Sequence, residues 1–201
     1  MEPGVTVCVA AHPARLRNGL LARALASVWA QTRQPERILV VNDTNREGAG
    51  ATRQRLLGMV ETEWTAWIDS DDEWFPEHLE KLLRVAEETG AVWVHPYFES
   101  VRDPFKTKEA PLGHFGLPYN PCTPHHTTMG VLENTALAQE VGFPPSSNHG
   151  SCSNEDWAHI TGFAQLCCER GLVMTHLAER TFRYNMGHGN TSGLPTQGDA
   201  R

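Results

Sequence analysis

Short apolar runs alternate with segments of helical periodicity over the first 95 residues, and this alternation limits the folds open to the chain. Four runs have the length and composition of buried strands: residues 5–11, 37–41, 64–68 and 91–95. Between them, apolar side chains recur at every third or fourth position around residues 20–28, 56–60 and 79–86. This order predicts an α/β fold with a Rossmann-like, mostly parallel central sheet flanked by helices. Because crossovers between parallel strands share one hand, the strand carboxyl ends line one edge, where ligands bind.

The second half of the chain is less regular, and its pattern predicts loops around short elements. We expect a loop over 103–124, a strand over 127–132, a short helix ending near 141, and a second loop over 144–154. A helix is expected over 155–170, followed by short strands at 172–177 and 181–184. The chain is therefore predicted to form a single domain over residues 1–192 with a flexible tail at 193–201.

Composition argues against several classes of protein. The net charge of −7 and the lack of a long basic run disfavour binding to duplex DNA through phosphate neutralisation. Five cysteines, an odd number without a C-x-x-C pair, are typical of free thiols in a reducing compartment. No window approaches the roughly 18 uninterrupted apolar residues of a membrane span. We therefore expect a soluble, cytoplasmic protein without stable membrane insertion.

Four acidic side chains crowd the end of the third predicted strand. They are Asp69, Asp71, Asp72 and Glu73, and two carboxylates 4 Å apart repel by about 1 kcal/mol even in water. Hard cations such as Mg²⁺ take one or two carboxylates and complete their shell with water and substrate phosphates. Capping of the next helix is the alternative, but Pro76 at the first helical position would make the residue before it the cap. The position at the strand end therefore favours a site in which a cation could bridge to a diphosphate.

Two other acidic positions each allow two interpretations. Asp43 follows the second strand, where it could bond the backbone of its own turn or accept from a base or ribose at the same sheet edge. Glu155 and Asp156 open a predicted helix, and Ser153 with Asp156 has the spacing of a capping box. A helix N-terminus that faces a cleft can also present a carboxylate as a general base.

Six segments, taken in order, resemble the family-two glycosyltransferases. They are SVWAQT, ILVVNDTN, GAGATRQRLLGMV, WTAWIDSDDEWFPEHLEKLL, NEDWAHITGFAQLCCERG and FRYNMGHGNTSG. The fourth is similar to the D-x-D region of that family, the fifth to its ED segment and the last to its closing strand and His-containing loop. The resemblance spans roughly residues 5–192.

The resemblance implies a GT-A fold that binds a nucleotide-diphosphate sugar, with a nucleotide-binding half at 1–100 and an acceptor half at 101–192. It places Asp43 against the nucleobase and Asp71 at the ribose or sugar, with Asp69 in the same loop. It also lets Arg53 face the donor phosphates; the alternative is a solvated helix arginine.

The same resemblance implies a Mn²⁺ or Mg²⁺ cofactor and a catalytic base. Asp72 would ligate the metal, with Asp71 and His188 as further metal candidates; His188 is equally well explained as an ordinary loop histidine. Asp156 would be the base, and Glu155 beside it would orient the acceptor.

Two departures from the family pattern affect these expectations. AAHP stands after the first strand where the family has a polar pair, and Gln54 follows Arg53 where asparagine is common. The chain also ends soon after the last motif, so a partner or a second copy of the chain could complete the acceptor surface, which leaves a homo-oligomer open.

The expected function is metal-dependent transfer of a sugar from a nucleotide-diphosphate sugar to an acceptor hydroxyl. Direct attack with a single base implies inversion at the anomeric carbon. The acceptor is open among a glycan, a lipid, a protein and a modified base. The alternatives are a non-catalytic nucleotide-sugar-binding GT-A-like protein and a sugar nucleotidyltransferase. The glycine-rich loop of nucleotidyltransferases follows the first strand, however, whereas GAGATR follows the second.

Overall fold

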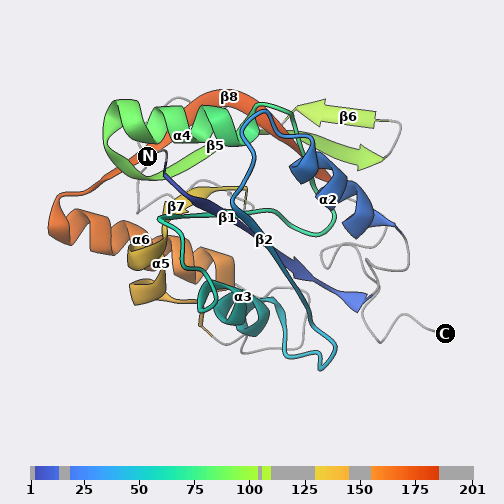
Figure 1. The fold of residues 1–201 in the computed structure, drawn as a ribbon, viewed down its shortest axis with the longest axis horizontal. Coiled ribbons are helices and arrows are strands. Elements are labelled where there is room, and N and C mark those ends of the chain that lie inside the picture. Colours follow the sequence, from blue (N-terminus) through green and yellow to red (C-terminus); the bar gives the residue numbers. More distant parts are fainter. Residues whose placement is uncertain (1–2, 14–18, 104–105, 110–129, 145–154, 186–201) are drawn as a thin grey trace.

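The computed structural model describes residues 3–13, 19–103, 106–109, 130–144 and 155–185. Its strands are β1 (Val5–Ala11), β2 (Arg37–Asn42), β3 (Trp64–Trp67), β4 (Glu73–Trp74), β5 (Ala91–Asp103), β6 (Lys106–Glu109), β7 (Leu132–Asn134) and β8 (Val173–Asn185). Its helices are α2 (Leu20–Trp29), α3 (Ala49–Leu57), α4 (His78–Thr89), α5 (Thr135–Val141) and α6 (Glu155–Arg170). The predicted α/β class is confirmed (Figure 1). The predicted tail and His188 lie outside the described residues.

The strands form one curled sheet in the order β2–β1–β3–β7–β5–β8–β4, with β6 paired to β5. The pairs β1–β2 and β1–β3 are parallel, as the alternation of strands and helices predicts, and β5–β8 is also parallel. The sheet as a whole is mixed rather than mostly parallel, because β7 enters antiparallel between β3 and β5. Leu132 lies opposite Ala66 on one side and Val94 on the other, so this short strand joins the two parallel parts.

Several predicted boundaries shift. The fourth strand runs on to Asp103, and the two short strands expected near the end form one strand, β8, of 13 residues. Of the strand predicted at 127–132, residues 127–129 lie outside the described residues, 130 and 131 are not strand, and β7 begins at Leu132. Helix α4 begins at His78 with Glu77 as its N-cap, so the inferred cap at Phe75 is wrong. The bounds of α6 are as predicted.

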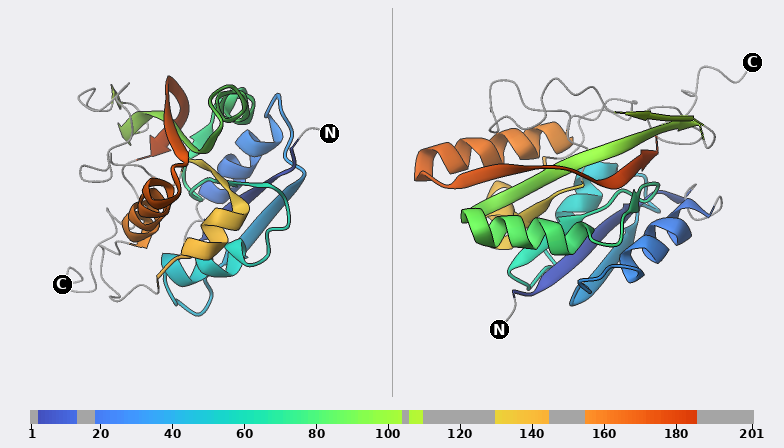
Figure 2. Two further views of the ribbon diagram at one scale, coloured as in Figure 1. Left: turned by 90° about the vertical axis from the view of Figure 1, so that its left-hand side faces the viewer. Right: turned by 90° about the horizontal axis from the view of Figure 1, so that it is seen from above.

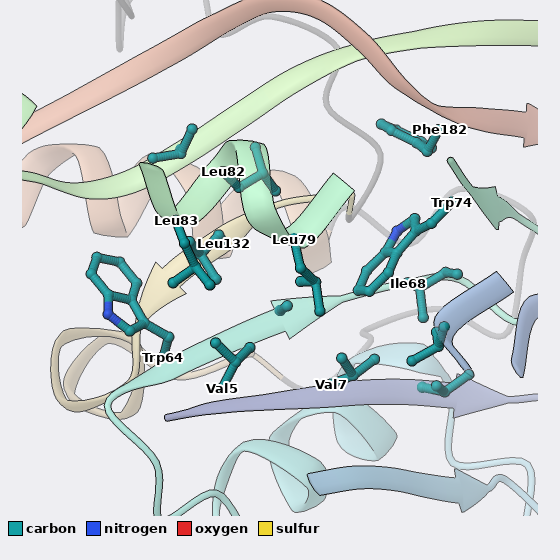
Figure 3. Close-up of a cluster of buried hydrophobic side chains, with 14 of the residues drawn as sticks. Val5, Val7, Trp64, Ile68, Trp74, Leu79, Leu82, Leu83, Leu132 and Phe182 are labelled. Carbon is teal, nitrogen blue, oxygen red and sulfur yellow. The ribbon is translucent and has the colours of Figure 1, made fainter. Parts of the chain in front are cut away.

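Helices cover both faces of the sheet because the strands are apolar on both sides. Val5 and Val7 of β1 belong to one core, which also contains side chains of α2 and Leu79 and Leu82 of α4 (Figure 3). Cys8, on the opposite face of β1, joins a second core formed largely by α3, α5, α6 and Trp93. Figure 2 shows these two helical layers on either side of the sheet. Burying a side chain such as leucine contributes about 1.5–3 kcal/mol, so both layers hold the strands rigidly.

This architecture brings the ends of β2 and β3 to the same edge. Both strands pair in parallel with β1, so Asp43 after β2 and the acids after β3 emerge on the same side. Among the described helices, none combines the length and the apolar composition needed to cross a bilayer.

Candidate active site

The acidic loop, residues 69–72, leads from β3 toward β4. It closes a turn in which the Asp72 N–H donates to the Asp69 carbonyl over 3.0 Å. The end of β8 fixes the loop from another direction: the Asn185 N–H donates to Asp72 Oδ1 over 2.9 Å, and the Asn185 amide donates to the Asp71 carbonyl over 2.5 Å. The three aspartates predicted from the sequence are therefore held in one braced loop at the sheet edge.

Asp72 lies in an environment that disfavours its negative charge. The residue is only 2% exposed. Burial is the main reason that its pKa is raised well above the ordinary value, and the charges of Asp69 and Asp71 raise it further. The hydrogen bond from Asn185 opposes this shift without cancelling it. A positive ion beside these oxygens would favour the charged form.

The donor set of the loop suits a hard divalent cation. Within the described residues, no group of three or more His, Cys, Asp and Glu side chains converges as a metal site. Mg²⁺ does not require one, since it is commonly bound by one or two carboxylates with water and substrate phosphates. Asp71 and Asp72 meet that requirement, whereas the predicted contribution of His188 lies outside the described residues.

Arg53 connects the acidic loop to the start of α6. One guanidinium nitrogen donates to Asp69 Oδ1 and the other to Glu155 Oε1, each over 2.7 Å. The Arg53 side chain is 7% exposed and that of Glu155 is 5% exposed, so the alternative of a solvated arginine is wrong. Burial acts to lower the pKa of Arg53, but Asp69, Glu155 and Asp156 outweigh it and raise the pKa. Arg53 thus holds carboxylates from two elements around one fixed positive charge.

Replacing Arg53 by methionine should lower the free energy of unfolding by about 3–5 kcal/mol, since the buried Glu155 carboxylate is then left without its partner. Urea unfolding followed by tryptophan fluorescence measures the change. Arg55→Met is the matched control on the same helix: Arg55 pairs loosely with Glu47 at 3.5 Å, and both side chains are exposed, so we expect a change within about 0.5 kcal/mol. Equal effects of the two substitutions would show that the buried bridge is unimportant.

Asp156 lies in the first turn of α6, where it is half-buried. Its Oδ1 accepts from the Trp157 N–H over 2.7 Å. Burial is the largest cause that raises its pKa; the positive charge of Arg53 opposes the rise, and Glu155 and Asp69 add to it. A carboxylate with a raised pKa is a better proton acceptor than an exposed one. Because Arg53 bonds both Asp69 and Glu155, it brings the first turn of α6, which also carries Asp156, next to the acidic loop.

Asp43 is engaged by the backbone of its own turn. Its two carboxylate oxygens accept from the N–H groups of Glu47 and Gly48 over 2.8 and 2.9 Å. The turn interpretation considered for the sequence is therefore correct, and Asp43 shapes the entry to α3. Each oxygen keeps a second lone pair, so the contact to a nucleobase stays a prediction.

Two site residues were not singled out from the sequence. Asn185 braces the acidic loop, and Tyr184 beside it in β8 is half-buried. Burial raises the pKa of the Tyr184 phenol, and the charges of Asp69, Asp72, Asp71 and Asp156 raise it further. The sequence feature that could have pointed to these two residues is the polar end of the FRYN segment. That feature can be interpreted only once β8 is known to pair with β4.

In its sheet and flanking helices, the chain is a GT-A domain. The sequence profile of Glycosyl transferase family 2 matches residues 21–136, and the chain belongs to this family. No curated protein matches the chain significantly.

Several solved structures share the fold. S. aureus TarS 1–349 in complex with UDP-GlcNAc superposes with a TM-score of 0.74 at 14% identity, over 96% of this chain and 62% of that one. S. aureus TarS 1–349 in complex with UDP gives 0.65 at 16% identity, over 90% and 60%. At these identities the likeness concerns the fold, and the chain spans about three-fifths of the length of both TarS structures.

Proposed function

We propose that the chain transfers a sugar from a nucleotide-diphosphate sugar to an acceptor hydroxyl, with a divalent cation and with inversion at the anomeric carbon. The observation that carries the proposal is the Arg53 bridge, which holds Asp69 of the acidic loop and Glu155 of α6 at 2.7 Å each. The bridge supports a site in which the acidic loop serves the donor and the first turn of α6 supplies the base. Membership of the family supports the same assignment.

The donor side of the reaction belongs to the acidic loop. Asp72 and Asp71 would hold Mn²⁺ or Mg²⁺, and Asn185 keeps Asp72 in place through its 2.9 Å hydrogen bond. Such a cation would neutralise charge on the departing nucleoside diphosphate. Because the TarS structures contain UDP-GlcNAc or UDP, uridine diphosphate sugars are the first donors to test.

The acceptor side belongs to the start of α6. Asp156 would take the proton of the attacking hydroxyl, and Glu155, fixed by Arg53, would orient the acceptor. One base and one direct displacement predict inversion. The raised pKa of Asp156, caused first by burial, suits it to proton transfer.

Two measurements test the proposal. Calorimetry with UDP and other nucleoside diphosphates, with and without Mn²⁺, should give binding that depends on the metal. A panel of nucleotide sugars, read by released diphosphate, should identify at least one hydrolysed donor. Binding without turnover would instead indicate a non-catalytic nucleotide-sugar-binding protein, and pyrophosphate-dependent exchange a nucleotidyltransferase. No binding of any nucleotide would overturn the proposal.

A further inference from the structure

A glutamate with no exposed surface lies in the middle of the sheet. Glu133 of β7 has a 0% exposed side chain. Its Oε1 accepts from the Trp67 indole N–H over 2.6 Å, and its Oε2 lies 2.8 Å from His159 Nε2. Burying a carboxylate is unfavourable unless every oxygen is paired, and here both oxygens have partners.

His159 is fixed from both of its ring nitrogens. Nδ1 lies 2.8 Å from the Gly142 carbonyl; because a carbonyl only accepts, Nδ1 carries a proton. The contact between Nε2 and Glu133 therefore holds a single shared proton. The Phe143 ring stacks on the imidazole at 3.9 Å with an interplanar angle of 14°. The ring thus has one orientation.

This network reaches three of the elements that supply the candidate site. His159 lies three residues after Asp156 on α6, and Trp67 lies two residues before Asp69. The Phe143 N–H donates to the side-chain carbonyl of Gln54 over 2.6 Å, and Gln54 directly follows Arg53. A continuous set of buried contacts therefore underlies α3, the end of β3 and the first turn of α6.

We propose that Glu133 and His159 are positioning residues that fix the first turn of α6, and with it Asp156, relative to the acidic loop. The inference rests on the proposed function. A buried ionic pair is seldom needed for stability, since apolar replacements are often neutral or stabilising. Its use is to define one geometry, and a displacement of about 1 Å at a reacting group can lower a rate about 10²-fold.

The test compares two variants that differ only at position 159. Glu133→Gln keeps both bonds: its carbonyl accepts from Trp67, and its amide donates to the unprotonated Nε2 of His159. Glu133→Gln with His159→Phe keeps the Trp67 bond and the stacking on Phe143 but removes both imidazole hydrogen bonds. We expect kcat for donor turnover to be about 10–100-fold lower in the double variant. The donor KM should stay within about twofold, since the acidic loop is unchanged.

Thermal unfolding and hydrogen exchange complete the experiment. A fall in kcat without a matching fall in folded fraction supports positioning, whereas equal kcat in the two variants overturns it. If the double variant does not fold, His159→Gln in the Glu133→Gln background takes its place under the same criteria. If the unaltered protein turns over no donor, the proposed function fails separately. In that case, amide hydrogen exchange in residues 155–159 tests the positioning role of Glu133 and His159. Exchange should be faster in the double variant, and unchanged exchange would refute the positioning role.

Discussion

Asp156→Asn should lower the rate of sugar transfer by about 10²–10⁴-fold, the usual contribution of a general base, while nucleoside diphosphate binding stays within about twofold. The asparagine keeps an oxygen for the Trp157 N–H, which Asp156 Oδ1 now accepts over 2.7 Å. It also removes a charge that burial disfavours, so the variant should fold at least as well as the parent. Steady-state kinetics and calorimetry measure the two effects. Glu169→Gln is the matched control, because it removes an exposed acid from the same helix.

The pH dependence gives an independent check on Asp156. The base must be ionised, so turnover should rise with pH through the pKa of this carboxyl. Burial, with Glu155 and Asp69, raises that pKa despite the opposing charge of Arg53, so the rise should lie above the range of an ordinary aspartate. This rise of turnover with pH should disappear in Asp156→Asn. If the variant keeps both the parental rate and the rise with pH, Asp156 is excluded from proton transfer.

The parts of the fold that could be predicted from sequence are those fixed by local pattern. β1 is an uninterrupted apolar run, and α6 is bounded by acids at its start and by Gly171, whose φ is 64°. The sequence predicts two short strands in place of β8, and the polar residues Glu179 and Arg180 lie between them. Parallel pairing with β5 continues on both sides of this point, with a register shift between Leu177 and Arg180, so the two halves form one strand. The three residues of β7 are too few to reveal an antiparallel insertion.

The candidate site also has a part that could be predicted from local sequence and a part that could not. The acids after β3 could be located because strand ends define a sheet edge. The partners of Arg53 could not be located from the sequence, since Asp69 and Glu155 lie 16 and 102 residues away along the chain. Position alone leaves both interpretations of Asp43 open. The structure supplies the backbone partners of the turn, while the nucleobase contact stays a prediction. Long-range pairing therefore decides roles that residue type leaves open.

Asp72→Asn should abolish the dependence of nucleoside diphosphate binding on Mn²⁺ and lower donor turnover by about 10³-fold or more. That factor corresponds to the several kcal/mol that a cation contributes at a phosphoryl leaving group. The substitution is nearly isosteric, and its side-chain oxygen can still accept from the Asn185 N–H, which now donates over 2.9 Å. The loop should therefore keep its shape while losing a negative oxygen ligand. Glu88→Gln, which removes an exposed charge on α4, is the control.

Stability separates this result from simple misfolding. Burial, and next the charges of Asp69 and Asp71, raise the pKa of Asp72 above its value in the unfolded chain, so the folded state binds the proton more tightly. The folded state therefore loses stability as the pH rises from the pKa of Asp72 in the unfolded chain to its higher pKa in the folded protein. An uncharged asparagine avoids this loss, so Asp72→Asn should have an equal or higher Tm at pH 7 without metal. Added Mn²⁺ with UDP should raise the Tm of the parent but not of Asp72→Asn. If both proteins gain equally, the cation binds elsewhere and Asp72 is not its ligand. A variant that is more stable yet inactive would mean that the acidic loop is kept for function at the expense of stability.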